Sequence, residues 1–372
     1  MKIVIIGSAH PLRGGGIATF NERLAAQLQK QGNEVIIYSF SLQYPSFLFP
    51  GKSQFTEEPA PEGLNIKSVI NSINPLNWLQ VGNEINRLNP DLIIIRYWMP
   101  FFGPCFGTIL RRVKKNRHTK VIAIADNVIP HEKRPGDTAF TRYFIKSVDA
   151  FITMSREVLN DLKQFTQKPA VYTPHPLYDN YGETISKDDA CNKIGLDPKT
   201  NYLLFFGFIR KYKGLDLLLE ALNEERVRQL GLKLIIAGEF YDGREVYDEL
   251  IEKYTLQDTV KLFTEFIPND EVRYYFSAAD VVVQPYRTAT QSGITQVAYH
   301  FEKPMIVTRV GGLAEVVPDG VVGFVAQPEA ASIADAIVRF YKSPIPLLQE
   351  NILKEKGKYS WDVFIERLMS II

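Results

Sequence analysis

Residues 202–222 read YLLFFGFIRKYKGLDLLLEAL, and this stretch decides the fold. A short apolar run leads into a basic turn, and the turn leads into a segment whose leucines recur at helical spacing. A strand that passes through a tight turn into a helix is the repeating step of a parallel α/β sheet covered on both faces. The stretch therefore predicts one βα unit of such a sheet.

The same step recurs along the chain. Short apolar, β-branched runs alternate with segments of helical period, as in repeated βαβ units. Residues 173–189, TPHPLYDNYGETISKDD, show no clear period, which places a linker near residue 180 and predicts two Rossmann-like domains. The runs predicted as strands are residues 3–6, 35–38, 92–95, 121–125, 150–154 and 170–172, and then 202–206, 234–237, 260–263, 281–283 and 305–307.

The composition limits the class of protein. With 372 residues the chain exceeds the usual size of one hydrophobic core, and a formal net charge of +1 does not indicate a partner such as nucleic acid. Cys105 and Cys191 show no metal-ligand spacing and no disulfide framework, which favours a reducing compartment. The sequence shows no signal-like start and no apolar stretch of roughly 18 residues, so we expect a cytoplasmic protein.

Two strand-to-helix turns in the second half are candidate phosphate sites. The first holds Arg210, Lys211 and Lys213 at the carboxyl end of a predicted strand, where open α/β sheets bind ligands. Arg and Lys side chains suit phosphate oxygens, so we interpret this turn as a diphosphate site, with a solvated basic turn as the alternative. The second turn, SGIT at residues 292–295, would offer backbone N–H groups at a helix start to the same ligand.

A glycine cluster follows the first predicted strand. Gly14, Gly15 and Gly16 precede a segment with an apolar helical face, so the backbone there could approach a polar ligand. A flexible turn is the alternative, because the cluster does not match the GxGxxG pattern of dinucleotide-binding proteins.

Residues 106–117 form a basic amphipathic segment. One helical face carries Phe106, Ile109, Leu110 and Val113. The segment could rest on an anionic membrane, or it could be an ordinary helix with its apolar face on the sheet, which leaves only the charges for the membrane. The basic residues of the segment are Arg111, Arg112, Lys114, Lys115 and Arg117.

Taken in order, these motifs resemble the retaining, metal-independent GT-B glycosyltransferases of family 4, over nearly the whole chain. The resemblance implies two Rossmann-like domains that face a central cleft: residues 1–180 for the acceptor, residues 181–345 for a nucleotide-sugar donor, and a helical segment, 346–372, that packs back on the first domain. It rests on GGG at 14–16, DNVIPHE at 126–132, FFGFIRKYKG at 205–214, AGE at 237–239, AADVVVQP at 278–285, KPMIVTRVGGLAEVV at 303–317 and SWDVF at 360–364.

The resemblance also implies roles for single residues. Arg210 and Lys213 look like the family's donor diphosphate pair, with catalytic action on the leaving group. His131 and Glu132 would orient the acceptor hydroxyl, or serve as local structural partners. No metal and no cofactor are implied besides the nucleotide-sugar co-substrate. Donor binding is implied for Gly15, Gly16, Arg210, Lys213, Glu239, Thr290, Gln291, Ser292, Gly293, Ile294, Thr295 and Gln296.

Two positions depart from the family pattern. The family usually has two glutamates separated by seven residues where this chain reads RTATQSGITQVAYH, so Thr290, Gln291 and Gln296 are the nearest groups for sugar or ribose hydroxyls. Asp126 stands where many relatives have a His that contacts the donor sugar. Asp126 could accept a hydrogen bond from a sugar hydroxyl, steady positive charge at the anomeric carbon, or cap the following turn.

The expected activity is transfer of a hexose-type sugar to a glycan, lipid-linked or other acceptor in surface polysaccharide or glycoconjugate biosynthesis. The family's mechanism needs no protein base, because the leaving phosphate accepts the acceptor's proton. Two other classes stay open: a nucleotide-sugar binding protein without turnover, and another two-domain nucleotide-sugar enzyme such as an epimerase. A nicotinamide oxidoreductase is disfavoured because no GxGxxG follows a strand.

Overall fold

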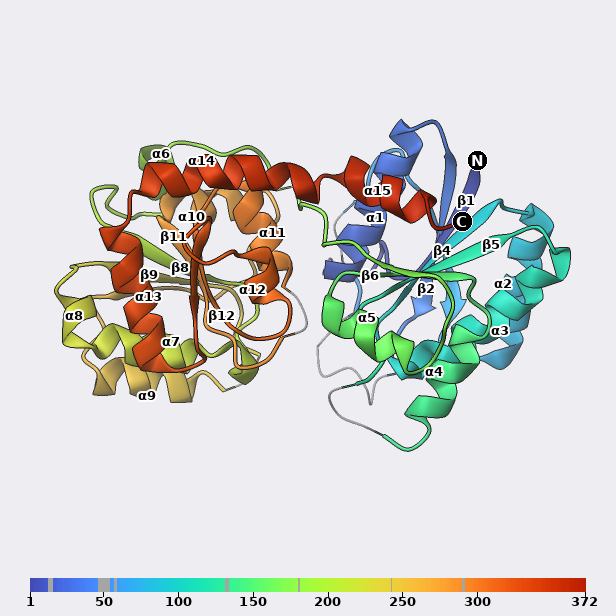
Figure 1. Cartoon of the computed structure of the whole chain (residues 1–372), viewed down its shortest axis with the longest axis horizontal. Helices are drawn as coiled ribbons and strands as arrows, with labels where there is room; N and C mark the ends of the chain where they lie inside the picture. The colour runs from blue at the N-terminus through green and yellow to red at the C-terminus, as the bar shows by residue number, and fades with distance from the viewer. Residues whose placement is uncertain are drawn as a thin grey trace. The chain divides into compact units, whose positions relative to one another are not determined.

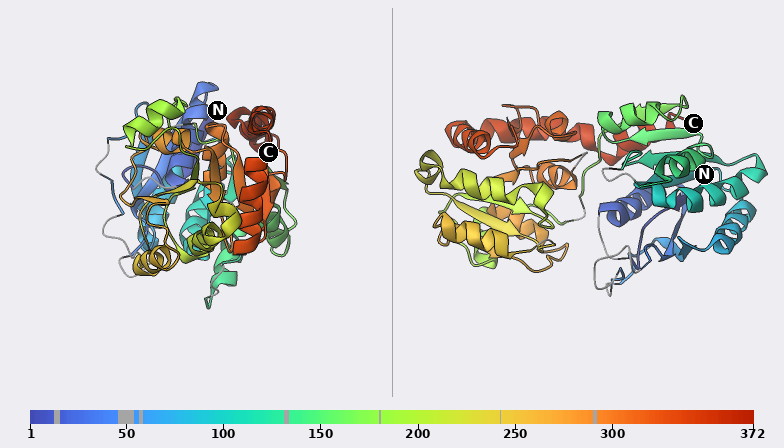
Figure 2. Two further views of the ribbon diagram at one scale, coloured as in Figure 1. Left: turned by 90° about the vertical axis from the view of Figure 1, so that its left-hand side faces the viewer. Right: turned by 90° about the horizontal axis from the view of Figure 1, so that it is seen from below.

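The computed structural model describes residues 1–12, 16–45, 54–56, 59–130, 134–179, 181–241, 243–289 and 292–372. The chain divides into two units, Met1–Pro174 together with Trp361–Ile372, and His175–Ser360 (Figure 1). Each unit is built around one parallel sheet with helices on both of its faces (Figures 1 and 2). Within the described ranges, no helix combines the length and the apolar composition that a membrane span requires.

The sheet of the first unit has the order β3-β2-β1-β4-β5-β6-β7, and all its pairs are parallel. The strand order reverses between β1 and β4, which makes this pair the topological switch point of the sheet. The strands are β1 (Lys2–Ile6), β2 (Glu34–Leu42), β3 (Asn65–Asn71), β4 (Leu92–Tyr97), β5 (Lys120–Ala125), β6 (Ala150–Thr153) and β7 (Ala170–Tyr172).

Two groups of helices cover this sheet. One face packs against α2 (Pro75–Leu88), α3 (Gly103–Val113), α4 (Asp137–Ile145) and α5 (Arg156–Lys163). The other face packs against α1 (Gly16–Lys30) and α15 (Trp361–Met369), where the ring of Phe20 lies 5.1 Å from that of Trp361 and 5.5 Å from that of Phe364. Two short 3-10 turns, η2 (Pro100–Phe102) and η3 (Lys114–Asn116), flank α3.

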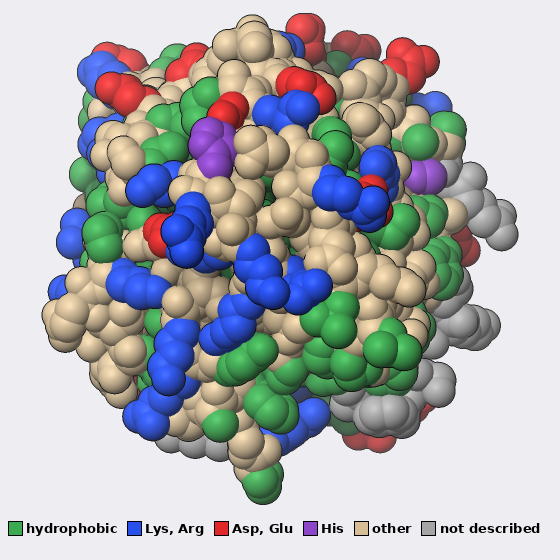
Figure 3. Space-filling view, turned by 90° about the vertical axis from the view of Figure 1, so that its right-hand side faces the viewer, with side chains coloured by type: hydrophobic (Ala, Val, Ile, Leu, Met, Phe, Trp, Pro, Cys, Tyr) green, Lys and Arg blue, Asp and Glu red, His purple; other side chains and the backbone are tan. Residues whose placement is uncertain are grey.

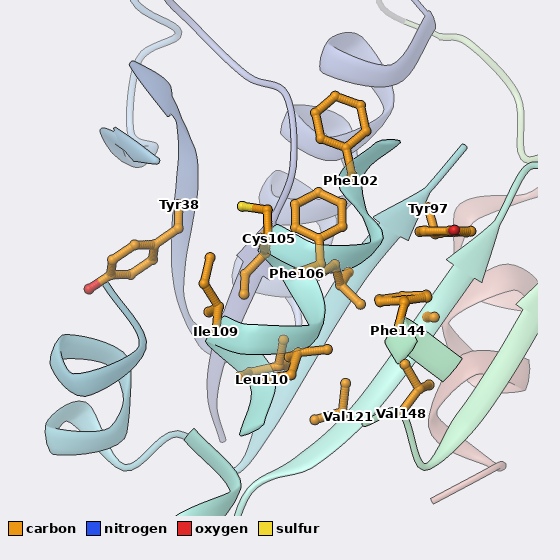
Figure 4. Close-up of a cluster of buried hydrophobic side chains, with 14 of the residues drawn as sticks. Tyr38, Tyr97, Phe102, Cys105, Phe106, Ile109, Leu110, Val121, Phe144 and Val148 are labelled. Atoms are coloured by element: carbon orange, nitrogen blue, oxygen red, sulfur yellow. The ribbon is translucent and has the colours of Figure 1, made fainter. Parts of the chain in front are cut away.

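The structure decides whether the apolar face of α3 lies on a membrane or on the sheet. Lys and Arg side chains gather in a band across the face of the first unit that Figure 3 shows, to which α3 and η3 contribute. Phe106, Ile109 and Leu110 turn inward beside Val121 of β5 (Figure 4), and Val113 is fully buried with them. The apolar stripe therefore lies on the sheet, and only the charged side of α3 is left for a partner.

The sheet of the second unit has the order β10-β9-β8-β11-β12-β13, again with parallel pairs. Its switch point lies between β8 and β11. The strands are β8 (Tyr202–Phe206), β9 (Lys233–Ala237), β10 (Val260–Phe263), β11 (Val281–Gln284), β12 (Met305–Thr308) and β13 (Gly323–Ala326).

The helices of the second unit also lie on both faces. One face is covered mainly by α7 (Leu215–Asn223), α8 (Glu225–Arg228), α9 (Glu245–Lys253) and α13 (Ala330–Lys342). The other is covered by α6 (Lys187–Lys193), α10 (Val272–Ala278), α11 (Gly293–His300) and α12 (Leu313–Val316), with α14 (Ile345–Lys356) nearby. The 3-10 turns are η4 (Lys211–Lys213) and η5 (Gly357–Tyr359).

The borders of the units differ from the expected ones. The chain changes unit after Pro174 rather than at residue 180, because Leu177 and Tyr178 are buried in the core of the second unit. Residues 346–360 also belong to the second unit: the backbone N–H of Leu177 donates to the carbonyl of Tyr359 over 2.9 Å. Only residues 361–372 pack on the first unit. Two strands, β3 and β13, have no counterpart among the predicted runs.

Candidate functional site

The basic turn after β8 folds back over the end of its own strand. Gly207 and Gly214 both have positive φ, 90° and 67°, which favours glycine. A Cβ on Gly214 would lie 2.0 Å from the carbonyl oxygen of Pro285, so the turn closes tightly on the segment after β11. Lys213 is thereby brought back to the strand end, with its Nζ 3.2 Å from where a Cβ on Gly207 would stand.

Lys213 is a buried cation that has no counter-ion in the part of the chain that the structure describes. The residue is 8% exposed, and among the described residues its ammonium group has no hydrogen bond and no ion pair. Burial lowers the pKa of Lys213 to about 8, and the nearby charge of Arg210 acts in the same direction. The Tyr286 ring, 5.7 Å from Nζ, gives only a weak cation–π contact. Because an unpaired buried ammonium is unfavourable, the position is suited to receiving an anion.

Arg210 provides a second cation in the same turn. Its guanidinium lies 4.1 Å from the centroid of the Tyr241 ring. In the described part of the chain it also has no hydrogen bond and no ion pair, so its N–H groups remain available. Arg210 is close enough to Lys213 to lower the pKa of that lysine. Within the described ranges, the turn thus presents two cations without a carboxylate partner at the switch point of the sheet.

The first turn of α11 meets these cations. Ser292 caps the helix, with the Ile294 N–H donating to its Oγ over 3.2 Å, and the hydroxyl of buried Tyr286 lies 3.4 Å from the same Oγ. The Ile294 Cδ1 lies 3.6 Å from the Cβ position of Gly207, the same point that Lys213 Nζ approaches. The structure therefore brings together the two turns that the sequence singled out. A helix N-terminus opposite a buried ammonium favours an anionic ligand.

Other predicted donor residues lie around the end of β8, where Lys213 and the start of α11 meet. A Cβ on Gly293 would lie 2.9 Å from the Tyr178 ring, which requires glycine there. The Thr295 hydroxyl donates to the Ser292 carbonyl, and the buried Gln296 carboxamide oxygen has no partner within the described residues. Glu239 follows β9, and its carbonyl accepts from the Ile209 N–H over 2.8 Å.

Asp126 of the first unit is held by a residue that the sequence analysis missed. Arg96 is the penultimate residue of β4 and binds Asp126 in a bidentate pair, with Nε to Oδ2 at 2.6 Å and Nη2 to Oδ1 at 2.8 Å. The two side chains are 4% and 10% exposed. The pair stands beside Gly7, at the switch point between β1 and β4. The only sequence signal for Arg96 is a charged residue that interrupts the apolar run of a strand.

The Arg96 guanidinium connects this pair to the C-terminal helix. It lies 4.0 Å from the centroid of the Phe20 ring, and Phe20 in turn packs on Trp361 and Phe364 of α15. The third nitrogen of the guanidinium, Nη1, is buried without a hydrogen-bond partner in the described part of the chain. Residues 361–372 therefore support the side of the sheet on which Asp126 is held.

The remaining predicted residues are placed as follows. Gly16 begins α1 after the first strand and so stands where the glycine turn was expected. The other residues lie outside the described ranges, so their predicted roles stay predictions. They are Gly14, Gly15, His131, Glu132, Thr290 and Gln291.

Comparison with known proteins covers both units. Residues 14–176 match the family model described as Glycosyltransferase Family 4, and residues 186–359 match that of Glycosyl transferases group 1. A D-inositol 3-phosphate glycosyltransferase of Pseudarthrobacter chlorophenolicus is 32% identical over 154 residues, which cover 40% of this chain and 36% of that protein. The chain therefore spans only about a third of that relative's length, at 36%.

Two further similarities extend over nearly the whole chain. A putative teichuronic acid biosynthesis glycosyltransferase of Bacillus subtilis is 23% identical over 362 residues, covering 91% of this chain and 89% of that protein. The Anabaena protein HepE, solved in complex with UDP, superimposes with a TM-score of 0.73 at 15% identity, covering 100% of this chain and 99% of that one. The structural likeness confirms the predicted fold class.

Replacing Lys213 by Met should stabilise the second unit. At pH 7 the buried ammonium destabilises the native state, since its pKa of about 8 lies below the 10.5 of a free lysine; we expect a gain of roughly 1–3 kcal/mol. Between these values the unfolded chain binds more protons than the native chain, so wild-type stability should rise with pH. The rise should be smaller in the variant, in which buried Lys303, whose pKa is also lowered to about 8, still contributes. Urea unfolding followed by circular dichroism at pH 7 and 9.5 measures both effects.

Exposed Lys211→Met is the matched control and should change neither stability nor its pH dependence. A Lys213→Met protein that is less stable than the wild type at pH 7 would contradict the destabilising role of the buried charge.

Proposed function

The chain belongs to the glycosyl transferases of group 1 and family 4 and has their GT-B fold, and from this we propose that it transfers a sugar from a nucleotide-diphosphate sugar to an acceptor hydroxyl. The observation that carries the proposal is the buried ammonium of Lys213, which has no ion pair among the described residues, beside Arg210 and the start of α11. A diphosphate supplies the negative charge that this position lacks. The UDP in the similar Anabaena structure supports a ligand of this chemistry.

We propose that the same cations assist the reaction. As the bond between the anomeric carbon and the diphosphate breaks, negative charge grows on the leaving phosphate, and Lys213 and Arg210 would stabilise it. The acceptor oxygen forms the new bond to the anomeric carbon, and its proton passes to the leaving phosphate. Retention of configuration, independence of metal ions and a hexose-type sugar are parts of the proposal that rest on the family resemblance.

Our proposal for the acceptor rests on a similar protein and on the basic side of α3 and η3. The name of the Bacillus subtilis relative supports a glycan or lipid-linked acceptor in a surface polymer. The exposed Lys115 and Arg117 belong to the basic side of α3 and η3, whereas Arg111 and Arg112 already donate to groups on α3 and its neighbours. We propose that this side contacts an anionic inner membrane surface through its charges alone.

The nucleotide proposal is tested by a thermal-shift screen with UDP, GDP, ADP, dTDP and CMP, first without and then with magnesium. One nucleoside diphosphate should raise the melting temperature by mass action. Lys213→Ala should weaken its binding by about tenfold or more, since a hydrogen bond to a charged group contributes roughly 1.5–3 kcal/mol.

Lys211→Ala, two residues away and exposed, is the control and should bind like the wild type. Binding that is equally strong in both variants, or absent with every nucleotide, would refute the diphosphate site. Release of nucleoside diphosphate from a sugar donor in the presence of acceptors separates a transferase from a binding protein without turnover.

Asp126→Asn should lower kcat with little change in the KM for the donor. The substitution removes the carboxylate charge that we propose to steady the reacting sugar, and it weakens the pair with Arg96. Because Trp78, Trp98 and Trp361 all lie in the first unit, tryptophan fluorescence reports on the folding of that unit separately. Unfolding at normal temperatures, with unchanged turnover in the folded fraction, would assign Asp126 to structure instead.

Membrane contact is tested by co-sedimentation with phosphatidylcholine vesicles that contain or lack phosphatidylglycerol. Lys115→Gln with Arg117→Gln should weaken binding to the anionic vesicles roughly thirtyfold, at about 1 kcal/mol for each charge. Lys199→Gln with Lys342→Gln removes the same charge from exposed positions of the second unit and should have little effect. Equal binding to neutral and anionic vesicles would contradict the proposal.

A further inference from the structure

Arg210 reaches its position from an extended backbone. It stands three residues beyond Gly207 with φ −134° and ψ 150°, immediately before η4. Within the described residues no carboxylate and no carbonyl holds its side chain. A free Arg side chain carries about 2 kcal/mol of rotamer entropy, which ligand binding would have to overcome. The guanidinium therefore needs another support if it is to be ready for a ligand.

Tyr241 gives the guanidinium that support. The ring lies 4.1 Å from the Arg210 carbon Cζ, a distance typical of a cation–π stack. The position of Tyr241 is fixed by the backbone: its N–H donates to the Ile209 carbonyl over 3.0 Å, and the Ile209 N–H donates to the Glu239 carbonyl over 2.8 Å. Ile209 is itself fully buried. The ring is thus tied to the residue that directly precedes Arg210.

A stacked ring supports an arginine without neutralising it. Two other arginines show the contrast: Arg96 is paired with Asp126, and Arg287 is paired with Asp216. A carboxylate on Arg210 would occupy its N–H groups and compete with phosphate oxygens. A ring contacts only the face of the guanidinium and leaves the N–H groups at its edge free for a bidentate phosphate contact.

From these contacts we infer that Tyr241 is a positioning residue, which holds the Arg210 guanidinium ready for the donor diphosphate. The inference rests on the proposed function and adds a residue that does not itself need to touch the ligand. Tyr241 is 40% exposed, so its replacement should leave the fold intact. The Phe208 ring, edge-on at 5.5 Å, steadies the tyrosine from the side.

The test uses inorganic pyrophosphate as the probe, because it carries the diphosphate without a base or a sugar. Isothermal titration calorimetry should show binding about two- to five-fold weaker for Tyr241→Leu than for the wild type, the size expected of an exposed cation–π contact. Tyr241→Phe keeps the ring and should restore most of the affinity. In the Arg210→Ala background, Tyr241→Leu should have no further effect, because the ring acts through the arginine.

Tyr143→Leu in the first unit is the matched control. The Tyr143 ring is 38% exposed, and the Arg111 guanidinium lies 3.6 Å from its centroid. The variant therefore loses a similar cation–π contact in the other unit and should bind pyrophosphate like the wild type. An effect of Tyr241→Leu that persists in the Arg210→Ala background would overturn the inference, because the ring would then contact the ligand directly.

Failure of the inference can be told from failure of the proposed function. If Arg210→Ala and Lys213→Ala weaken pyrophosphate binding while Tyr241→Leu does not, only the role of Tyr241 is lost. If neither cation variant changes binding, the diphosphate site itself is refuted, and with it the inference.

Discussion

Parallel strand pairing is the constraint on which the rest of this structure depends. Because the strands of each sheet run in one direction, every connection must cross over the sheet, and all strands end at the same edge. Where the strand order reverses, successive crossovers go to opposite faces and a space is left at that edge. Arg96 with Asp126 stands at one such point, and Lys213 with the start of α11 stands at the other.

The two buried cations at these switch points, Arg96 and Lys213, differ in how their charge is compensated. The Arg96 charge is satisfied inside the protein by a bidentate carboxylate and by an aromatic ring. Lys213 lies near the ring of Tyr286, but among the described residues it has no carboxylate partner. Burial therefore lowers its pKa. A satisfied pair fixes local structure, whereas an unsatisfied charge lowers stability and favours binding. This difference is why we base the proposed function on Lys213.

The sequence predicted the interior of each sheet and the local turns, but not contacts between distant segments. Interior strands such as β4 and β8 are buried on both faces and therefore read as apolar runs, whereas the edge strand β3 is largely half-exposed and β13 is short and begins with glycine. Lys213 could be selected because its turn is continuous in sequence. Tyr241 and Tyr286 could not, since neighbouring strands, rather than spacing along the chain, bring them to the cations.

The return of the chain to the first unit affects the order in which the protein can fold during synthesis. The apolar side of α1, which includes Phe20, is covered by α15, and α15 comes from residues 361–369. A growing chain emerges from the ribosome N-terminus first, so the whole of the second unit must be translated before this cover exists. The first unit can therefore be completed only after the second unit has been translated, and its aromatic face stays uncovered until translation reaches α15.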